Sequence, residues 1–234
     1  EQWQANLTAA VDLAPEHLSC YGLKVEEGTP LFAVRDTAGL PGDEEQADMY
    51  LWTVEFLAQM GYAQYEISNF AKPGRESRHN LKYWTLQEYV GFGPGAHSDF
   101  GGVRYAYGRD LEGYIRGVQT HAPMLSESES IPPLDRDTEW LMLGLRTVQG
   151  LDPKVFERRF RRRFDCFRPF LEECRTAGYA VEEEGCWHLT PKGFLVSNQI
   201  IGGMLDALAA EKRRRAEATA RGDFRVDLGN PGKA

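Results

Sequence analysis

The strongest constraint on the fold of this chain is a twenty-residue stretch that runs from His79 to Ser98. It holds two of the chain's five histidines, two tyrosines, a tryptophan, a phenylalanine and three glycines. The glycines at positions 91, 93 and 95 alternate with other residues, so the backbone here can adopt positive φ or approach a ligand closely. Two interpretations follow. The stretch is either a binding site for something flat or electron-rich, or a buried loop whose rings belong to the core.

The composition is that of a soluble globular protein of one or two domains, because 42% of its 234 residues are hydrophobic and 26% are charged. The net charge of −8 argues against a general nucleic-acid binder, whose surface is normally basic. No apolar run approaches the roughly 20 residues that span a bilayer. The four cysteines have no CxxC spacing, which is typical of reduced thiols in a cytoplasmic protein.

The first part of the chain alternates helix and strand patterns. Apolar residues at helical spacing predict helices over 1–13 and 43–60, the second begun by a capping box of Asp43 and Gln46. Branched and aromatic residues predict strands over 17–25 and 62–68. Strand, helix and strand in this order are one step of an α/β fold. Cys20 and His17 fall on opposite faces of their strand, which favours core packing over a metal site.

The second part follows a segment at 122–133 that is rich in Ser, Glu and Pro and reads as an irregular domain boundary. Beyond it, the patterns predict helices at 135–148, from Pro153, at 169–177 and at 192–210, with short strands at 179–182 and 186–189. This order is typical of a winged-helix-like module. Five arginines between 158 and 163 raise the possibility of DNA binding, but phenylalanines interleave with them at helical spacing, as on a solvated helix face.

Several motifs together resemble the HemW family of haem chaperones, relatives of oxygen-independent coproporphyrinogen III oxidase in the radical SAM superfamily. The resemblance rests first on HNLKYW at 79–84 and GFGPGAHS at 91–98. Further agreement comes from LSCY at 18–21, EGTP at 27–30, YEISNFA at 65–71 and MLGLR at 142–146. Leu189-Thr190, Gly193 and Ser197-Asn198 extend it towards residue 205, so the resemblance covers nearly the whole chain except its last thirty or so residues.

The resemblance implies an α/β fold, namely the C-terminal part of a radical SAM partial (β/α) barrel followed by a small winged-helix-like α+β domain. The corresponding division is 1–125 for the barrel part with its haem-binding segment, 126–210 for the winged-helix-like domain, and 211–234 for a charged, disordered tail. The chain opens within a predicted helix and lacks the CxxxCxxC motif that holds the [4Fe–4S] cluster of radical SAM proteins. We therefore expect a C-terminal fragment of a longer protein.

For the site, the resemblance implies that HNLKYW binds haem and that His79 is the metal ligand. A neutral imidazole is a common axial ligand of haem iron, Tyr83 and Trp84 would wall the porphyrin, and Asn80 would orient the imidazole. Without the resemblance, the residues alone favour a structural role for His79, with its imidazole hydrogen-bonded to the backbone. His97 is the reserve candidate and a possible second axial ligand. The backbone of Gly91, Gly93, Gly95 and Ala96 resembles the segment that passes S-adenosylmethionine in radical SAM enzymes.

The implied function is that of a haem chaperone, which binds haem and transfers it to a recipient protein. The intact protein would also bind S-adenosylmethionine with a [4Fe–4S] cluster, and no nucleic acid or membrane span is expected. The first alternative is an oxygen-independent coproporphyrinogen III oxidase-type radical SAM enzyme of porphyrin biosynthesis, so whether the chain belongs to an enzyme stays open. The second alternative is a winged-helix interaction module.

The cysteine spacing generates the first prediction. Because three thiolates at CxxxCxxC spacing are missing, this chain should form no [4Fe–4S] cluster when it is reconstituted anaerobically with iron and sulfide. Protein-bound iron, acid-labile sulfide and the visible absorption spectrum report the result. A family member that carries the motif is the positive control. Stoichiometric cluster iron on this chain would show that the argument from spacing is wrong.

Overall fold

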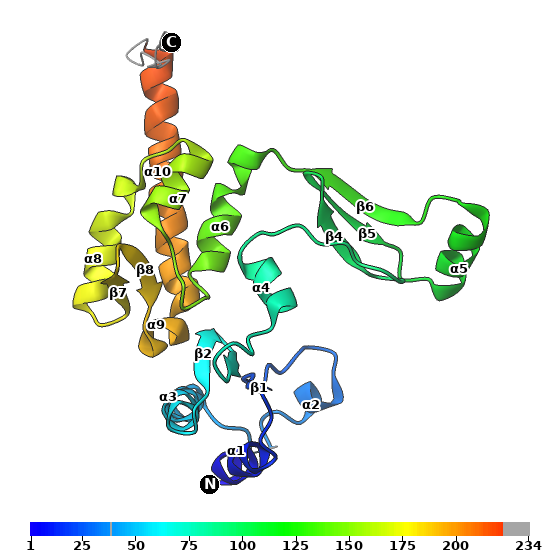
Figure 1. The fold of residues 1–234 in the computed structure, drawn as a ribbon, viewed down its shortest axis with the longest axis vertical. Coiled ribbons are helices and arrows are strands. Elements are labelled where there is room, and N and C mark those ends of the chain that lie inside the picture. The colour runs from blue at the N-terminus through cyan, green and yellow to red at the C-terminus, as the bar shows by residue number, and fades with distance from the viewer. Residues whose placement is uncertain (38, 222–234) are drawn as a thin grey trace.

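The computed structural model describes residues 1–37 and 39–221, which form two helical bodies and a projecting arm (Figure 1). The N-terminal body contains the first three helices and a small sheet. The C-terminal body contains the last five α-helices and a β-hairpin. A short helix, α4 (Arg78–Trp84), lies between the two bodies, and the arm follows it in the chain. The predicted α/β class is confirmed.

The N-terminal body is built around a three-stranded antiparallel sheet in the order β1-β3-β2. Its elements are α1 (Gln2–Asp12), β1 (His17–Ser19), α2 (Pro30–Ala33), α3 (Asp43–Gln59), β2 (Ala63–Glu66) and β3 (Asn69–Ala71). Strands β1 and β2 both pair antiparallel with β3, so they run in the same direction with β3 between them. The buried core of this body comprises Leu7, Leu57, Tyr62 and Phe70.

Two local expectations for this body are corrected. The strand predicted over 17–25 ends at Ser19, because Ser19 pairs with Asn69, the first residue of β3, and the neighbouring chain turns away beyond it. The predicted capping box at Asp43 is wrong. Gly42 is the N-cap of α3, and the Gln46 amide instead donates to the Pro41 carbonyl at 3.0 Å.

The arm is a second antiparallel sheet, in the order β4-β5-β6, with α5 (Leu111–Thr120) at its tip (Figure 1). Its strands are β4 (His97–Phe100), β5 (Val103–Tyr107) and β6 (Leu125–Ser130). The segment at 122–133 was expected to be irregular, yet β6 occupies 125–130 and pairs with β5 along its length. All six β6 side chains are exposed, so its sequence has no apolar face by which a strand is recognised. Residues 126–130, the first residues of the predicted second domain, therefore belong to the sheet of the arm. The domain division at 125/126 stays a prediction.

An ion-pair network centred on the buried pair of Arg136 and Asp99 fixes the base of the arm to the C-terminal body. Arg136 donates from both terminal nitrogens to Asp99 on β4, at 2.6 and 2.7 Å. Arg104 on β5 donates to Asp99 at 3.1 Å and to both carboxylate oxygens of Glu139 at 2.7 and 2.9 Å. Such two-pronged guanidinium–carboxylate pairs fix orientation as well as distance. The arm therefore projects from an anchored base.

The C-terminal body is organised by a cluster of buried phenylalanines. Phe156 contacts the rings of Phe160, Phe164 and Phe167 at centroid distances of 5.2–5.7 Å, and all four side chains are at most 1% exposed. The elements around them are η1 (Pro133–Arg136), α6 (Asp137–Gly144), α7 (Pro153–Phe160), η2 (Phe164–Cys166), α8 (Arg168–Thr176), β7 (Ala180–Glu183), β8 (Cys186–Leu189), α9 (Pro191–Leu195) and α10 (Ser197–Ala220). The predicted order of three helices, two strands and a final helical segment is confirmed, but the single helix predicted over 192–210 is divided at Val196 into α9 and α10. Asp152 caps α7 as expected, with its carboxylate accepting from Lys154 N at 2.7 Å.

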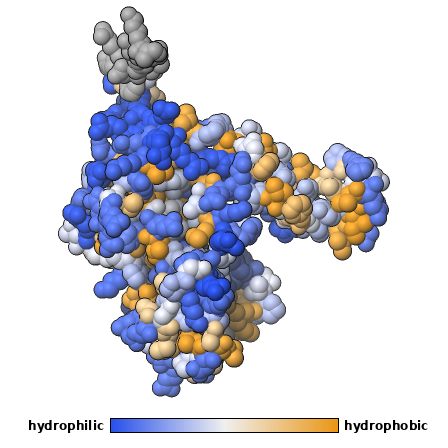
Figure 2. All heavy atoms as spheres, in the orientation of Figure 1, coloured by the Kyte–Doolittle hydropathy of each residue, from blue (hydrophilic) through white to orange (hydrophobic). Residues whose placement is uncertain are grey.

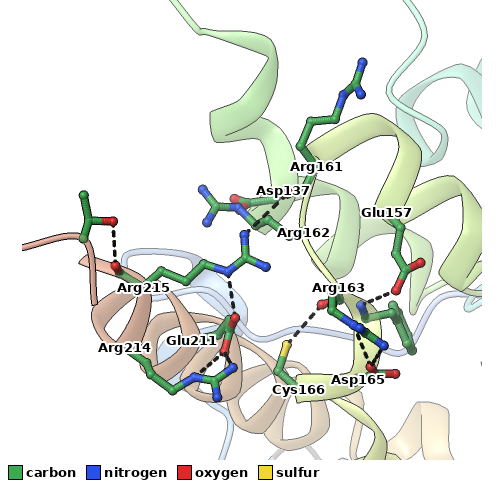
Figure 3. A network of polar contacts seen from close by, with 12 residues as sticks. Asp137, Glu157, Arg161, Arg162, Arg163, Asp165, Cys166, Glu211, Arg214 and Arg215 are labelled. Atoms are coloured by element: carbon green, nitrogen blue, oxygen red, sulfur yellow. Dashed lines mark hydrogen bonds and ion pairs between the residues drawn. The ribbon is translucent and has the colours of Figure 1, made fainter. Parts of the chain in front are cut away.

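A second set of ion pairs ties α10 to the rest of this body (Figure 3). Asp137 is fully buried at the start of α6, where it pairs with Lys212 at 2.8 Å and Arg162 at 3.1 Å. Burial alone would raise the pKa of Glu211, but hydrogen bonds from Arg215 and Arg214 outweigh it and lower the pKa. These contacts lie along α10, which continues to Ala220. Residues 211–220 are therefore helical rather than disordered, and 222–234 lie outside the described residues.

Backbone hydrogen bonds join the two bodies. The Ile67 N–H donates to the Arg146 carbonyl at 2.9 Å, and the Val148 N–H donates to the Tyr65 carbonyl at 3.2 Å. The chain after α6 thus extends the hairpin of β2 and β3. Among the described residues, the helices are too short or too polar to cross a membrane.

The phenylalanine cluster generates a stability prediction. Replacing Phe156 by alanine should lower the free energy of unfolding by about 3–5 kcal/mol, because a fully buried ring leaves a cavity that its neighbours fill only in part. Chemical denaturation measured by circular dichroism gives the value. Phe92→Ala is the matched control, since that ring is 85% exposed and its loss should change stability by less than about 0.5 kcal/mol. Equal losses in both variants would contradict the packing.

The base of the arm generates a pH prediction. Hydrogen bonds from Arg136 hold the pKa of Asp99 below its ordinary value, against the opposing effect of burial. The ionised form therefore stabilises the fold above about pH 4, and this contribution is lost as the pH falls through the lowered pKa. Asp99→Asn should be less stable than the wild type at pH 7 by about 3–5 kcal/mol, because Arg136 keeps a buried charge without its partner.

The difference between Asp99→Asn and the wild type should shrink below about pH 4, where the wild-type carboxylate takes up its proton. Thermal melts at several pH values measure it. Asp48→Asn, on an exposed face of α3, is the control and should follow the wild type throughout. A destabilisation by Asp99→Asn that is equal at pH 3 and pH 7 would remove the electrostatic explanation.

Candidate functional site

The HNLKYW motif lies in α4, where it follows Arg78, rather than in a loop. Ser77 caps the helix by accepting a hydrogen bond from Asn80 N at 3.3 Å, and the helix ends at Trp84. A helix of this sequence displays His79 and Tyr83 one turn apart on the same face. Trp84 follows His79 by five residues, which corresponds to a rotation of roughly 140° around the axis. The motif therefore presents two different surfaces.

The first surface is an exposed cluster of one imidazole and two phenol rings. The His79 Nε2 atom lies 2.8 Å from the Tyr83 hydroxyl, and the two rings meet edge to face with centroids 5.1 Å apart. Tyr83 in turn meets Tyr89 edge to face at 4.6 Å. His79 is exposed and Tyr83 is 39% exposed, so a ligand can reach the imidazole from solvent. Burial raises the pKa of Tyr89, and the nearby charge of Asp99 adds to this effect.

Asn80 is turned towards the N-terminal sheet instead of towards His79. Its side chain hydrogen-bonds Tyr65, whose hydroxyl also lies 2.8 Å from His17 Nε2. Burial raises the pKa of Tyr65 and lowers the pKa of His17. Asn80 thus attaches α4 to the sheet, and the expected hydrogen bond from Asn80 to the His79 ring is not formed.

Trp84 lies on the second surface, against the C-terminal body. It lines a pocket of about 740 Å³ together with Trp140 of α6, Arg159 of α7 and His188 of β8. The sequence predicted that Trp84 and Tyr83 wall one ligand, but only Tyr83 contacts the His79 ring. Sequence analysis also missed the pocket, because its residues come from positions 84 to 188 and no local spacing connects them.

The glycine-rich segment runs along the arm towards α5 at its tip. A Cβ atom at Gly91 would lie 2.3 Å from the His97 carbonyl oxygen, and Gly93 and Gly95 have φ values of 107° and 74°. The glycines are therefore required by the fold itself. The N–H groups of Gly91, Gly93, Gly95 and Ala96 donate respectively to Ser98 Oγ, Tyr114 OH, Gly108 O and Gly93 O. Because these N–H groups are already bonded within the protein, a ligand at this segment would contact its carbonyl oxygens and Cα atoms instead.

His97 starts β4, where it is exposed and pairs with Ala106 of β5. It belongs to the arm, whereas His79 belongs to α4. The structure thus distributes the nine predicted site residues over four places: the exposed ring cluster, the contact of Asn80 with the N-terminal sheet, the pocket that Trp84 lines, and the arm.

The cysteines do not form a metal centre in the described part of the chain. No three His, Cys, Asp or Glu side chains gather there as metal ligands. Burial raises the pKa of Cys20 and of Cys166 to about 11, so both thiols stay protonated at neutral pH. These four cysteines do not fit a [4Fe–4S] cluster.

Part of the basic run at 158–163 forms ion pairs and hydrogen bonds within the C-terminal body (Figure 3). Arg162 pairs with the buried Asp137, and Arg163 pairs with Asp165 at 2.6 Å. The Arg161 carbonyl accepts a hydrogen bond from Arg215 at 3.4 Å. These contacts favour a structural use of the run over a surface for nucleic acid.

Comparison with known proteins gives one family match and a consistent set of relatives. Residues 131–196 match the HemN C-terminal domain. The haem chaperone HemW of Bacillus subtilis is 33% identical over 206 residues, which cover 87% of this chain and 54% of the relative. HemW of Escherichia coli is 33% identical over 208 residues, covering 86% and 53%. The mitochondrial radical S-adenosyl methionine domain-containing protein 1 of Danio rerio is 36% identical over 165 residues, covering 66% and 37%.

Among solved structures, coproporphyrinogen III oxidase (HemN) of Escherichia coli, a radical SAM enzyme, is similar in fold. The TM-score is 0.62 over 83% of this chain and 49% of that one, at 21% sequence identity. This likeness shows a shared fold. The chain spans about half the length of the curated relatives that it matches.

Proposed function

The chain is a HemW relative that carries a HemN C-terminal domain, and from this premise we propose that it holds haem for transfer to a recipient protein, with His79 as the iron ligand. The observation that carries the proposal is the exposed ring cluster on α4. An imidazole is a common axial ligand, and here it contacts the ring of Tyr83, which in turn contacts the half-buried ring of Tyr89, at a surface open to solvent.

The Tyr83 hydroxyl supports this role by orienting the imidazole. A histidine that binds a metal usually has a partner that fixes its ring, and Tyr83 lies one helical turn away on the same face. Because this hydroxyl lies at Nε2, it orients the ring for iron at Nδ1; binding of iron at Nε2 would require the whole Tyr83 side chain to turn away. Tyr83 and Tyr89 then offer apolar edges against which one face of a porphyrin can pack.

Exposure of the ligand suits a cargo that must be handed on. A haem held at a surface helix can be approached by a recipient without unfolding of the core around it. Because the phenylalanine core and the ion-pair networks lie elsewhere, loading and release would leave them intact. His97, on β4, remains the alternative ligand.

The role of the intact protein in S-adenosylmethionine binding is part of the same proposal. Gly91, Gly93, Gly95 and Ala96 would contribute carbonyl and Cα atoms to such a ligand, since their N–H groups are bonded within the arm. The cluster would need cysteines that this chain does not supply. We assign no step of haem transfer to either cofactor.

The ligand assignment generates the fourth prediction. His79→Ala should shift or abolish the Soret band of bound haem, because it removes the imidazole from α4. Haem titration followed by absorption spectroscopy measures the change. Tyr83→Phe keeps the ring and removes the hydroxyl, so it should leave iron bound through His79 with at most a small loss of affinity, about fivefold.

His121→Asn is the matched control for the loss of an imidazole. His121 is exposed at the C-terminal end of α5 with φ of 55°, a conformation that asparagine tolerates. Its spectrum should equal that of the wild type. If His97→Ala abolishes the Soret band while His79→Ala does not, His97 is the ligand. If neither variant nor the double variant changes the titration, this stretch does not hold haem.

A further inference from the structure

One edge of the arm's sheet is open. In the order β4-β5-β6, strand β6 has β5 on one side and, within the described residues, no strand on the other. Figure 2 shows the arm projecting clear of the two bodies, and all six side chains of β6 are exposed. The opposite edge differs, because Tyr89 and Asp99 exchange two backbone hydrogen bonds beside β4, at 2.9 and 3.0 Å. The open edge is therefore that of β6.

The register shows which backbone groups of β6 point outwards. The Ile131 N–H donates to the Gly102 carbonyl at 3.0 Å, and the pairing with β5 is regular from residue 130 back to residue 127. Hydrogen-bonded and non-hydrogen-bonded positions alternate along an antiparallel pair. The N–H and C=O groups of Ser128 and Ser130 therefore point away from β5. A further strand beside β6 would find these groups placed to bond it.

The same edge carries two carboxylates that the protein does not pair. Glu127 and Glu129 are two residues apart in the regular part of the strand, so their side chains lie on one face of the sheet. Both are exposed, and neither carboxylate makes an ion pair or hydrogen bond within the described part of the chain. Arg104 lies directly across from Glu129, but its guanidinium binds Asp99 and Glu139 instead. The open edge is therefore negatively charged.

These charges determine what can pair with β6. A second copy of β6 running antiparallel would bring glutamates against glutamates, and like charges in facing strands are destabilising. A segment with Lys or Arg at every second position would instead place a cation opposite each carboxylate. Glu127 and Glu129 would then occupy non-hydrogen-bonded positions of the new pair, where facing side chains are closest. Charge complementarity thus favours a basic, extended partner.

We propose that β6 is a docking edge for a basic, extended segment of another protein, which adds a strand to the three-stranded sheet of the arm. Backbone hydrogen bonds at Ser128 and Ser130 supply the pairing. Ion pairs of Glu127 and Glu129 with alternate Lys or Arg residues supply the selectivity, as side chains do when a peptide extends a sheet. The docking edge lies on the arm, and the inference does not depend on the proposed haem ligation at His79.

The test titrates the capped peptide TKTKTKT against the isotope-labelled full chain at low salt, followed by amide NMR spectra. The shifts should be saturable and centred on the amides of Ser128 and Ser130, which should also exchange more slowly with solvent. The peptide TETETET should cause no shifts. N-methylation of the threonines keeps the charge of TKTKTKT but removes the donors that face β6, so it should abolish binding.

Charge variants test the selectivity. The double variant Glu127→Gln and Glu129→Gln should bind TKTKTKT about fivefold more weakly, because two cross-strand ion pairs are lost. The double variant Glu44→Gln and Glu45→Gln is the matched control, since it removes the same charge from the exposed first turn of α3. It should bind the peptide as the wild type does. Thermal melts check that both variants are folded.

Three results would overturn the proposal. They are the absence of saturable shifts at Ser128 and Ser130, equal affinities of the two double variants, or undiminished binding of the N-methylated peptide. The last result would mean that the peptide is attracted by charge without strand pairing. His79→Ala should bind TKTKTKT as the wild type does, so the proposed haem ligation and this docking edge can be rejected one at a time.

Discussion

Two adjacent buried side chains of opposite charge, Arg136 and Asp137, determine how the parts of this chain are put together. Arg136 holds Asp99 at the base of the arm, and Asp137 holds Lys212 of α10 and Arg162 beyond α7. Removing one partner of a buried pair leaves a charge in a poorly solvated place, which costs roughly 3–5 kcal/mol. The start of α6 must satisfy both residues at once. Its position therefore fixes the arm on one side and the helical body on the other.

The position of α6 also affects the two faces of α4. Glu139 and Trp140 follow within the first turn of α6, where Glu139 binds Arg104 of the arm and Trp140 packs on Phe156. Trp140 also faces the pocket that Trp84 lines from α4. The exposed imidazole and the pocket thus lie on two faces of one short helix, and the position of that helix depends on the charge pairs at the start of α6. A mutation at Arg136 would therefore act on both faces of α4 from a distance.

The elements that the sequence predicted correctly are those with a local pattern. The phenylalanines from 156 to 167 recur at helical spacing and become the core, and the two short strands of the hairpin flank the turn at Glu184-Gly185. Strands β4 and β6 carry no such pattern. Ser98 and Asp99 are buried polar residues, and Asp99 is explained by its ion pairs with Arg104 of β5 and with Arg136, 37 residues away. The sequence identified the motif at 79–84. It did not predict that Tyr83 and Trp84 lie on different surfaces, which follows from the helical geometry of α4.

The exposure of His79 bears on how a haem carrier differs from a haem enzyme. A protein that retains haem surrounds it, because burial of a large aromatic surface contributes affinity at about 25 cal/mol for each Å² removed from water. A surface helix leaves much of that area in solvent, so one imidazole and two phenol edges would give a bond that a recipient can compete for. Transfer needs only that the recipient buries more of the macrocycle than α4 does. On the proposed function, the small contact area around His79 is therefore what allows the chain to give haem up.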